Sequence, residues 1–136
     1  MGATSKVIYQ GNLRTSATHL RSGTNIITDA PTDNNGKGEA FSPTDLVATS
    51  LARCMITIMG IKARNMEIDI EGTTASIVKV MASGPRRIEE IVIDVTMPSN
   101  NFKESEKTIL EKVARTCPVA LTLHPDTKQT IQFIWT

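Results

Sequence analysis

Two cysteines are the residues of this chain best suited to covalent chemistry, and they stand at Cys54 and Cys117 of 136 residues. So wide a separation does not match the short Cys-x-x-Cys spacing of zinc sites. A metal centre would have to recruit His19 and His124 from unrelated parts of the chain, so we expect no metal and no other cofactor. Each cysteine could instead be a small buried apolar residue, which is common for free cysteine.

Nucleophilic chemistry requires a thiolate, and an ordinary cysteine, with a pKa of about 8.5, is mostly a neutral thiol at pH 7. Cys54 is expected about three turns inside a helix, where the helix dipole no longer acts. Burial disfavours a thiolate, so a positively charged side chain would have to favour it. The neighbouring Arg53 points about 100° away from Cys54 around that helix, and we expect it to be an ordinary polar-face residue.

The sequence around Cys54 predicts a long helix that begins at Pro43 and ends near Arg64. Ser42 is a favourable N-cap, Pro43 suits the first helical position, and Asp45 stands where a capping box needs its acid. Cys54 borders a narrow polar stripe that consists of Thr49, Ser50, Arg53 and Thr57. A helix with so little polar surface is expected to be buried on most sides.

The apolar positions opposite this stripe, among them Leu51, Met55 and Met59, are more numerous than one small domain is expected to cover. Left exposed, they would form a larger apolar patch than soluble monomers usually tolerate. A twofold symmetric partner is the commonest solution. The sequence therefore predicts an obligate homodimer built on this helix.

The rest of the chain predicts strands and one further helix around the central helix. A polar, flexible loop is expected over residues 31–41, and Pro118 should end the second helix just after Cys117. The predicted strands cover residues 6–10, 12–20, 24–28, two alternating stretches within 66–97, and 130–135, and the second helix covers residues 102–116. This order is typical of an α+β fold with antiparallel sheets, in a single domain of residues 1–136.

Charge and composition limit the kinds of binding partner and the cellular compartment that we expect for this chain. Fifteen basic and fourteen acidic residues leave a formal charge of +1, so we expect no nucleic-acid partner. The apolar stretches are short and interrupted, and the N-terminus has no apolar secretory signal. We therefore expect a cytoplasmic protein that does not cross a membrane, in a compartment where a cysteine pair is more often reactive than a permanent disulfide.

Two motifs resemble those of the OsmC/Ohr family of thiol-dependent peroxidases. One is Ser42-Pro43-Thr44-Asp45-Leu46-Val47-Ala48 leading to Cys54, and the other is Cys117-Pro118-Val119-Ala120. The glycine-rich loop before Ser42 and an early arginine, Arg14, also fit, and the likeness extends over essentially the whole chain. The resemblance implies an OsmC-like fold, an intertwined homodimer with each central helix buried against its partner, and active sites at the interface.

The resemblance also implies a reaction and a role for each residue. An organic hydroperoxide is the substrate, Cys54 attacks it and becomes a sulfenic acid, and Cys117 resolves that acid as a disulfide. An external dithiol, either a small molecule or a lipoyl protein, resets the pair. Arg14 would favour the Cys54 thiolate, with Arg21 as the second choice.

One position departs from the pattern of the peroxidases. The glutamate that commonly pairs with the arginine corresponds to Thr44, and an acid, Asp45, follows one residue later. The carboxylate that would hold Arg14 is therefore not identified from the sequence. An OsmC-like binding or structural module without significant peroxidase activity is the alternative function.

Overall fold

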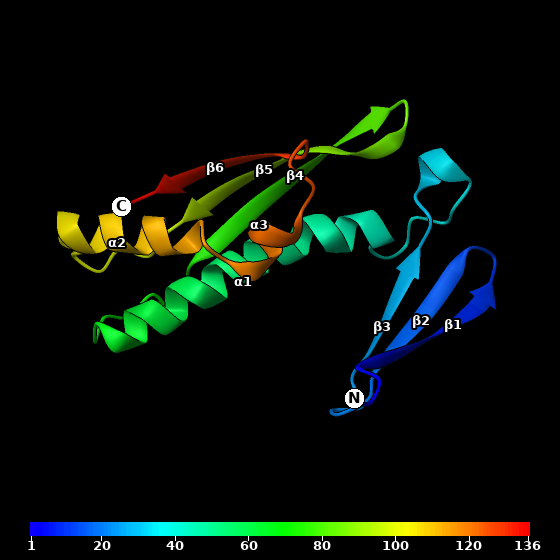
Figure 1. Cartoon of the computed structure of the whole chain (residues 1–136), viewed down its shortest axis with the longest axis horizontal. Helices are drawn as coiled ribbons and strands as arrows, with labels where there is room; N and C mark the ends of the chain where they lie inside the picture. Colours follow the sequence, from blue (N-terminus) through cyan, green and yellow to red (C-terminus); the bar gives the residue numbers. More distant parts are fainter. The chain divides into compact units, whose positions relative to one another are not determined.

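A computed structural model describes all 136 residues, which form two compact units, Met1–Val47 and Ala48–Thr136 (Figure 1). The first unit is a three-stranded antiparallel sheet of β1 (Ser5–Gly11), β2 (Arg14–His19) and β3 (Asn25–Asp29), in that order. Residues 11 to 13 adopt positive φ angles, which makes the tight turn between β1 and β2. The three predicted strands are confirmed, whereas the single domain stays a prediction.

The segment after β3 is a hydrogen-bonded turn rather than the flexible loop expected from its composition. It contains the short 3-10 helix η1 (Thr32–Asn34), and the Gly36 N–H donates to the Pro31 carbonyl at 2.9 Å. A Cβ at Gly36 would lie 1.8 Å from the carbonyl oxygen of Ala30, so only glycine fits this close approach. The segment therefore has one defined path between β3 and the helix that follows.

The long helix α1 (Pro43–Asn65) begins at the predicted residue. Its capping box is present, because the Asp45 N–H donates to Ser42 Oγ at 3.0 Å and the Ser42 N–H donates to Asp45 Oδ2 at 2.9 Å. These two bonds satisfy donors that the first helical turn would otherwise leave unpaired. The helix start was predictable because the cap involves only neighbouring residues.

Burial of α1 differs from the expectation of a helix buried on most sides. Its buried side chains form one face, which consists of Ala48, Leu51, Ala52, Met55, Met59 and Ala63. Leu51, Met55 and Met59 are fully buried within the chain itself, so the expectation that these three need a partner chain is wrong. The sheet and the second helix of the same unit already cover them.

The second sheet is formed by β4 (Thr74–Ser83), β5 (Arg86–Thr96) and β6 (Lys128–Ile134), in that order. β4 and β5 form the predicted hairpin, but β6 pairs with β5 in parallel. The helices α2 (Glu104–Ala114) and α3 (Pro118–Thr122) occupy the connection, which returns the chain to the starting end of β5 as a parallel pairing requires. Figure 1 shows α1 and α2 on the same face of this sheet.

Inward-facing side chains of β5 and of the helices form the hydrophobic core of the second unit. Ile91, Ile93 and Val95 of β5 are fully buried, as are Leu110 of α2 and Cys117. From Ile91 to Val95 every second residue of β5 belongs to this core, as the alternation in the sequence predicts. The core therefore places Cys117 beside the apolar face of the sheet.

Residues 66–71 do not form the strand that their alternating isoleucines predict. Glu67 and Gly72 have φ angles of 57° and 95°, which breaks the extended path at both ends. Between them, the Asp69 Oδ1 accepts the Glu71 N–H at 2.8 Å, and the Thr73 N–H donates to the Ile70 carbonyl at 3.1 Å. Local turns of this kind compete with sheet pairing.

α1 also passes a length and hydropathy test for a membrane-crossing helix, with a mean hydropathy of 1.4. The core helix of a folded domain passes the same test. Here its apolar face packs in the core of the second unit, so its apolar composition has a structural explanation.

Candidate active site

Cys54 and Cys117 lie together in the core of the second unit, although 62 residues separate them in the chain. Both are free thiols; Cys54 on α1 is half-buried and Cys117 is fully buried. The two thiols interact directly, since a hydrogen bond with Cys54 is one cause of the shifted pKa of Cys117. The fold therefore places two unbridged thiols side by side, one of them open to solvent.

Cys117 is the N-cap residue of α3. Its Sγ accepts the Ala120 N–H at 3.3 Å, and Pro118 occupies the first helical position. Burial raises the pKa of Cys117, the Cys54 thiol raises it further, and the N–H groups of Ala120 and Val119 lower it in part. Since burial is the largest cause, Cys117 is held as a neutral thiol at neutral pH.

The two thiols therefore differ in access and in environment. Cys54 is the one that a dissolved substrate can approach, whereas Cys117 is fully covered. A buried neutral thiol beside an accessible one can trap an oxidised sulfur as a disulfide before it reacts further. This difference is what a two-cysteine redox cycle needs, with Cys54 first and Cys117 second.

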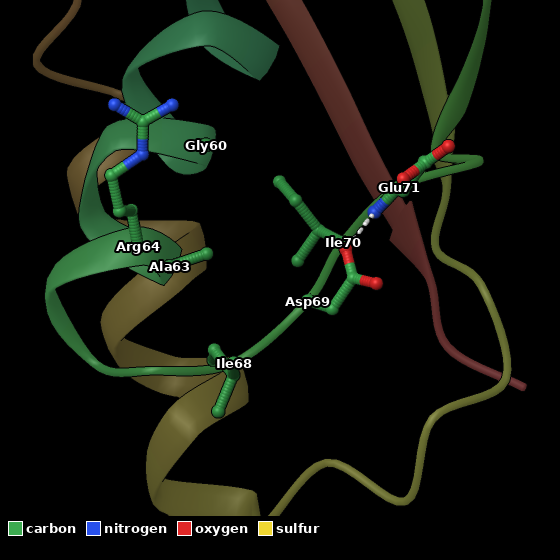
Figure 2. A pocket seen from close by; sticks show the side chains of 7 residues that line it. All are labelled: Gly60, Ala63, Arg64, Ile68, Asp69, Ile70 and Glu71. Atoms are coloured by element: carbon green, nitrogen blue, oxygen red, sulfur yellow. Dashed lines mark hydrogen bonds between the residues drawn. The ribbon is translucent and has the colours of Figure 1, made fainter.

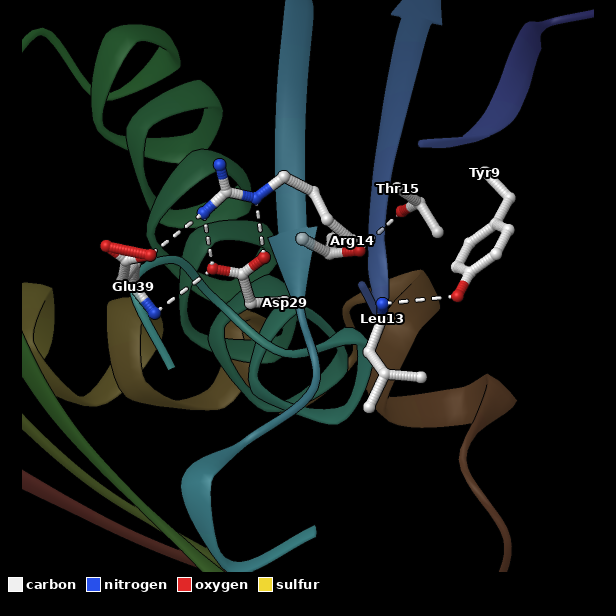
Figure 3. A network of polar contacts seen from close by, with 7 residues as sticks. Tyr9, Leu13, Arg14, Thr15, Asp29 and Glu39 are labelled. Atoms are coloured by element: carbon white, nitrogen blue, oxygen red, sulfur yellow. Dashed lines mark hydrogen bonds and ion pairs between the residues drawn. The ribbon is translucent and has the colours of Figure 1, made fainter. Parts of the chain in front are cut away.

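Arg14 lies in the first unit, where it forms a bidentate ion pair with Asp29 (Figure 3). Nε donates to Oδ1 at 2.7 Å and Nη2 donates to Oδ2 at 2.8 Å. Asp29 Oδ2 also accepts the Glu39 N–H at 3.1 Å, and a Glu39 carboxylate oxygen lies 3.4 Å from Nη2. Arg14 is thus held by two carboxylates, neither of which is at position 44 or 45.

The charges in this cluster stabilise one another. The pKa of Asp29 is lowered, first by the hydrogen bonds from Arg14 and further by the Glu39 N–H, while burial opposes the shift. The pKa of Arg14 is raised by the same pair. The Asp29 side chain has no exposed surface, and three N–H donors satisfy it, as a buried carboxylate requires.

Asp29 and Glu39 are functional candidates that the sequence did not single out. Arg14 and Asp29 are direct neighbours across the β2–β3 ladder, so the strand register creates the pair. A signal was present in the sequence, because Asp29 directly follows the predicted strand 24–28, just before Ala30 and Pro31. Fourteen acidic residues compete for that role until the register is known.

The other residues considered as support for Arg14 are not part of the Arg14 cluster. Asp45 and Thr44 belong to the start of α1, where Asp45 closes the capping box and the Thr44 hydroxyl lies 3.2 Å from Ser42 Oγ. Arg21 is exposed in the turn between β2 and β3. Arg14 belongs to the first unit and the thiols to the second, so contact between Arg14 and Cys54 stays a prediction.

The two histidines have local partners in separate units. His19 Nδ1 lies 2.6 Å from Ser22 Oγ, and His124 Nδ1 lies 3.8 Å from a carboxylate oxygen of Asp126. Arg53 is exposed on α1, as its place in the polar stripe predicts. Neither histidine lies near the thiols or the Arg14 cluster in its own unit, and Arg53 has the ordinary polar-face role expected for it.

A cleft of about 400 Å³ opens at the C-terminal end of α1, between this helix and residues 68–71 (Figure 2). Gly60, Ala63 and Arg64 line it on the helix side. It contains neither thiol and none of the predicted site residues. The thiol pair and the Arg14 cluster are therefore the groupings with a chemical rationale.

Comparisons with known proteins agree with this arrangement of the fold. Residues 36–132 match the model of the OsmC-like protein family. A solved structure of a candidate osmotic stress induced and detoxification response protein from Psychrobacter arcticus 273-4 is 59% identical, with a TM-score of 0.94, and the match covers 98% of this chain and 96% of that one.

Two structures of organic hydroperoxide resistance proteins share the fold at low sequence identity. The protein from Legionella pneumophila is 15% identical with a TM-score of 0.74, over 97% of each chain. The protein from Elizabethkingia anophelis is 13% identical with a TM-score of 0.70, over 100% of this chain and 99% of that one. No curated protein matches the sequence.

Proposed function

Because this chain belongs to the OsmC-like protein family, we propose that it is a thiol-dependent peroxidase that reduces organic hydroperoxides. The observation that supports the proposal most directly is the contact between two free thiols of unequal exposure, Cys54 and Cys117. The fold shared with organic hydroperoxide resistance proteins supports the choice of substrate. The activity would serve an antioxidant stress response in the cytoplasm.

The proposed cycle moves two electrons from a dithiol to the peroxide. The Cys54 thiolate attacks one peroxide oxygen, so that an S–O bond forms, the O–O bond breaks, and the leaving alkoxide takes a proton to become an alcohol. The Cys117 sulfur then attacks the sulfenic sulfur, forming the disulfide and releasing water. An external dithiol, a small molecule or a lipoyl protein, exchanges with this disulfide and restores both thiols as its own sulfurs become a disulfide.

Arg14 is the cation proposed to favour the Cys54 thiolate and the departing oxygen. Its Nη1 group has no protein partner, whereas Nε and Nη2 are occupied by Asp29 and Glu39. A free N–H pair on a fixed guanidinium can donate to an anionic sulfur or oxygen, and charge-assisted hydrogen bonds are the strong ones. Arg21 is a weaker choice, because it is exposed in a turn and no carboxylate pairs with it.

The homodimer is a further part of the proposal. The residues that support it lie on β1, and not at the buried positions Leu51, Met55 and Met59 of α1. Val7, Ile8 and Tyr9 of β1 are consecutive and each is more than 60% exposed, so apolar side chains are uncovered on both faces of the strand. A second copy that covers them would be an obligate partner. Light scattering should give about 30 kDa, twice the 14.8 kDa of the chain, and the melting temperature should rise with protein concentration.

Intact mass after one equivalent of cumene hydroperoxide tests the cycle directly. The expected product has lost two hydrogen atoms, with a Cys54–Cys117 linkage in its peptide map. The Cys54→Ser variant is the matched control and should give no such product. A folded wild-type chain that consumes no peroxide would contradict the proposal and would favour the binding or structural module. Two observations favour that alternative: Thr44 stands where the peroxidases have a glutamate, and carboxylates already neutralise the charge of Arg14.

A further inference from the structure

We propose that Asp29 is the positioning residue for Arg14 in this reaction, and that Glu39 is a second, displaceable carboxylate that restrains it. The inference rests on the proposed peroxidase function and deepens it. It assigns the carboxylate role to the end of β3 and the turn after it, and not to the start of α1, where Thr44 and Asp45 stand.

Asp29 has the properties of a fixed partner. Its side chain is fully buried, its two oxygens bind Nε and Nη2 of Arg14 at 2.7 and 2.8 Å, and the Glu39 N–H at 3.1 Å ties it to the chain after the turn. A bidentate pair fixes the plane of a guanidinium as well as its position. The free Nη1 group of Arg14 therefore has a set direction.

Glu39 has the opposite properties. Its side chain is 64% exposed, and its contact with Arg14 Nη2 is 3.4 Å long, at the limit of a hydrogen bond. Exposed ion pairs of this kind contribute little and are screened by salt. A thiolate or a peroxide oxygen that approaches Arg14 can displace Glu39 without disturbing Asp29.

Neutralising each of the two carboxylates should have an opposite effect on the reaction, so experiment can distinguish their roles. Arg14 contributes +1 while Asp29 and Glu39 contribute −1 each, with Lys37 as a further cation near Asp29. Removing the charge of Glu39 leaves Arg14 fixed and less compensated, so the reaction should become faster. Removing the charge of Asp29 releases Arg14 from its position, and misplacing a reacting group by about 1 Å can cost about a hundredfold in rate.

The test compares Asp29→Asn and Glu39→Gln in the full chain, each alone and combined with Arg14→Ala, with cumene hydroperoxide as substrate. We expect Asp29→Asn to lower kcat/KM by about tenfold to a hundredfold and Glu39→Gln to raise it several-fold. In the Arg14→Ala background both effects should vanish, because both act through Arg14. Glu104→Gln removes a carboxylate on α2 that is even more exposed than Glu39 and also contacts a cation, Lys107; it is the charge-matched control and should change nothing.

Several outcomes would overturn the inference. If Asp29→Asn costs as much without Arg14 as with it, Asp29 is a structural residue only. A Glu39→Gln variant slower than wild type would remove the restraining role. If Asp29→Asn does not fold, Asp29→Glu keeps the charge but shifts the carboxylate, and its kcat/KM should still fall only where Arg14 is present.

A second readout separates this inference from the proposed function. If the wild-type chain consumes no peroxide, the peroxidase proposal fails, and the rate of Cys54 alkylation by iodoacetamide at pH 7 tests the cluster instead. Glu39→Gln should then accelerate alkylation several-fold in the wild type and not in the Arg14→Ala background. Equal rates in all four proteins would overturn the inference as well.

Discussion

The thiol pair and the Arg14 cluster place reactive groups in opposite environments. Cys54 and Cys117 lie against an apolar core, and the groups that contact Cys117 are the other thiol and two backbone N–H groups. Arg14, in contrast, is ionised and bound to two carboxylates, with one of them fully buried. A thiol is stable in an apolar core because it is neutral, whereas a buried charge is stable only when its partners are present.

This contrast has a consequence for how each region responds to substitution. Replacing a thiol by a hydroxyl of similar size removes chemistry and leaves packing almost unchanged. Removing Arg14 or Asp29 leaves the other without its charged partner. The thiol region should therefore separate activity from stability, and the arginine region should couple them.

The largest effect is expected for Cys54→Ser, which should abolish peroxide consumption while the fold survives. Serine is nearly isosteric with cysteine but does not form an anion at neutral pH, so the nucleophile is lost. Peroxide consumption and circular dichroism together would show a folded, inactive protein. Activity retained in this variant would assign the nucleophile to another group.

Cys117→Ser should leave the first turnover intact and block recycling. Without a resolving thiol, the Cys54 sulfenic acid persists and excess peroxide oxidises it to the sulfinic acid. One equivalent of alcohol per chain forms as Cys54 becomes the sulfenic acid, and a second forms as excess peroxide oxidises it to the sulfinic acid, with a total gain of two oxygen atoms in the intact mass and no further turnover. Repeated turnover with dithiol at the wild-type rate would show that Cys117 does not resolve.

Local signals made part of this architecture predictable from the sequence. The helix start depends on Ser42 and Asp45, which are three residues apart, and the two thiols stand out because the chain has no other cysteine. The apolar alternation of β5 was equally clear. In these places the residues that determine the structure are neighbours in the sequence.

Other features could not be predicted, either because local turns override a strand pattern or because the feature depends on long-range pairing. Ile68 and Ile70 fit a strand pattern, but the positive φ angles of Glu67 and Gly72 prevent extended pairing. β6 is parallel to β5 because of a connection that contains two helices. Asp29 meets Arg14 through strand register, and register is set by the whole sheet.

Acid should weaken the arginine region more than the thiol region. The pKa of Asp29 is lowered in the folded chain, so its stabilising contribution is fully present above the unfolded value of about 3.9 and is lost as pH falls through the folded value. Urea unfolding should show wild type more stable than Asp29→Asn at pH 7, with the difference shrinking between about pH 4 and pH 2.

Asp69→Asn is the matched control for this acid effect. Asp69 also accepts a backbone N–H, but it forms no ion pair with an arginine. The difference in stability between wild type and Asp69→Asn over the same pH range gives the reference for removing a carboxylate that has no arginine partner. An Asp29→Asn difference that is constant from pH 7 to pH 2 would mean that the charge of Asp29 does not stabilise the fold.

The smallest effect is expected at alkaline pH, where only the thiol region responds. The pKa of Cys117 is raised, chiefly by burial, so the folded chain favours the neutral thiol. The sign follows directly: its contribution to stability is fully present below the unfolded value of about 8.5 and is lost as pH rises through the raised folded value. In the presence of a reductant, wild type should therefore lose stability between pH 8 and pH 10, and Cys117→Ala should lose less over the same range.

Arg14 keeps its charge throughout because its pKa is raised as well, so the ion pair with Asp29 adds nothing to this change. If Cys117→Ala declines as steeply as wild type, the buried thiol is not the group that titrates, and the contrast between a neutral thiol core and an ionised arginine cluster would have to be abandoned.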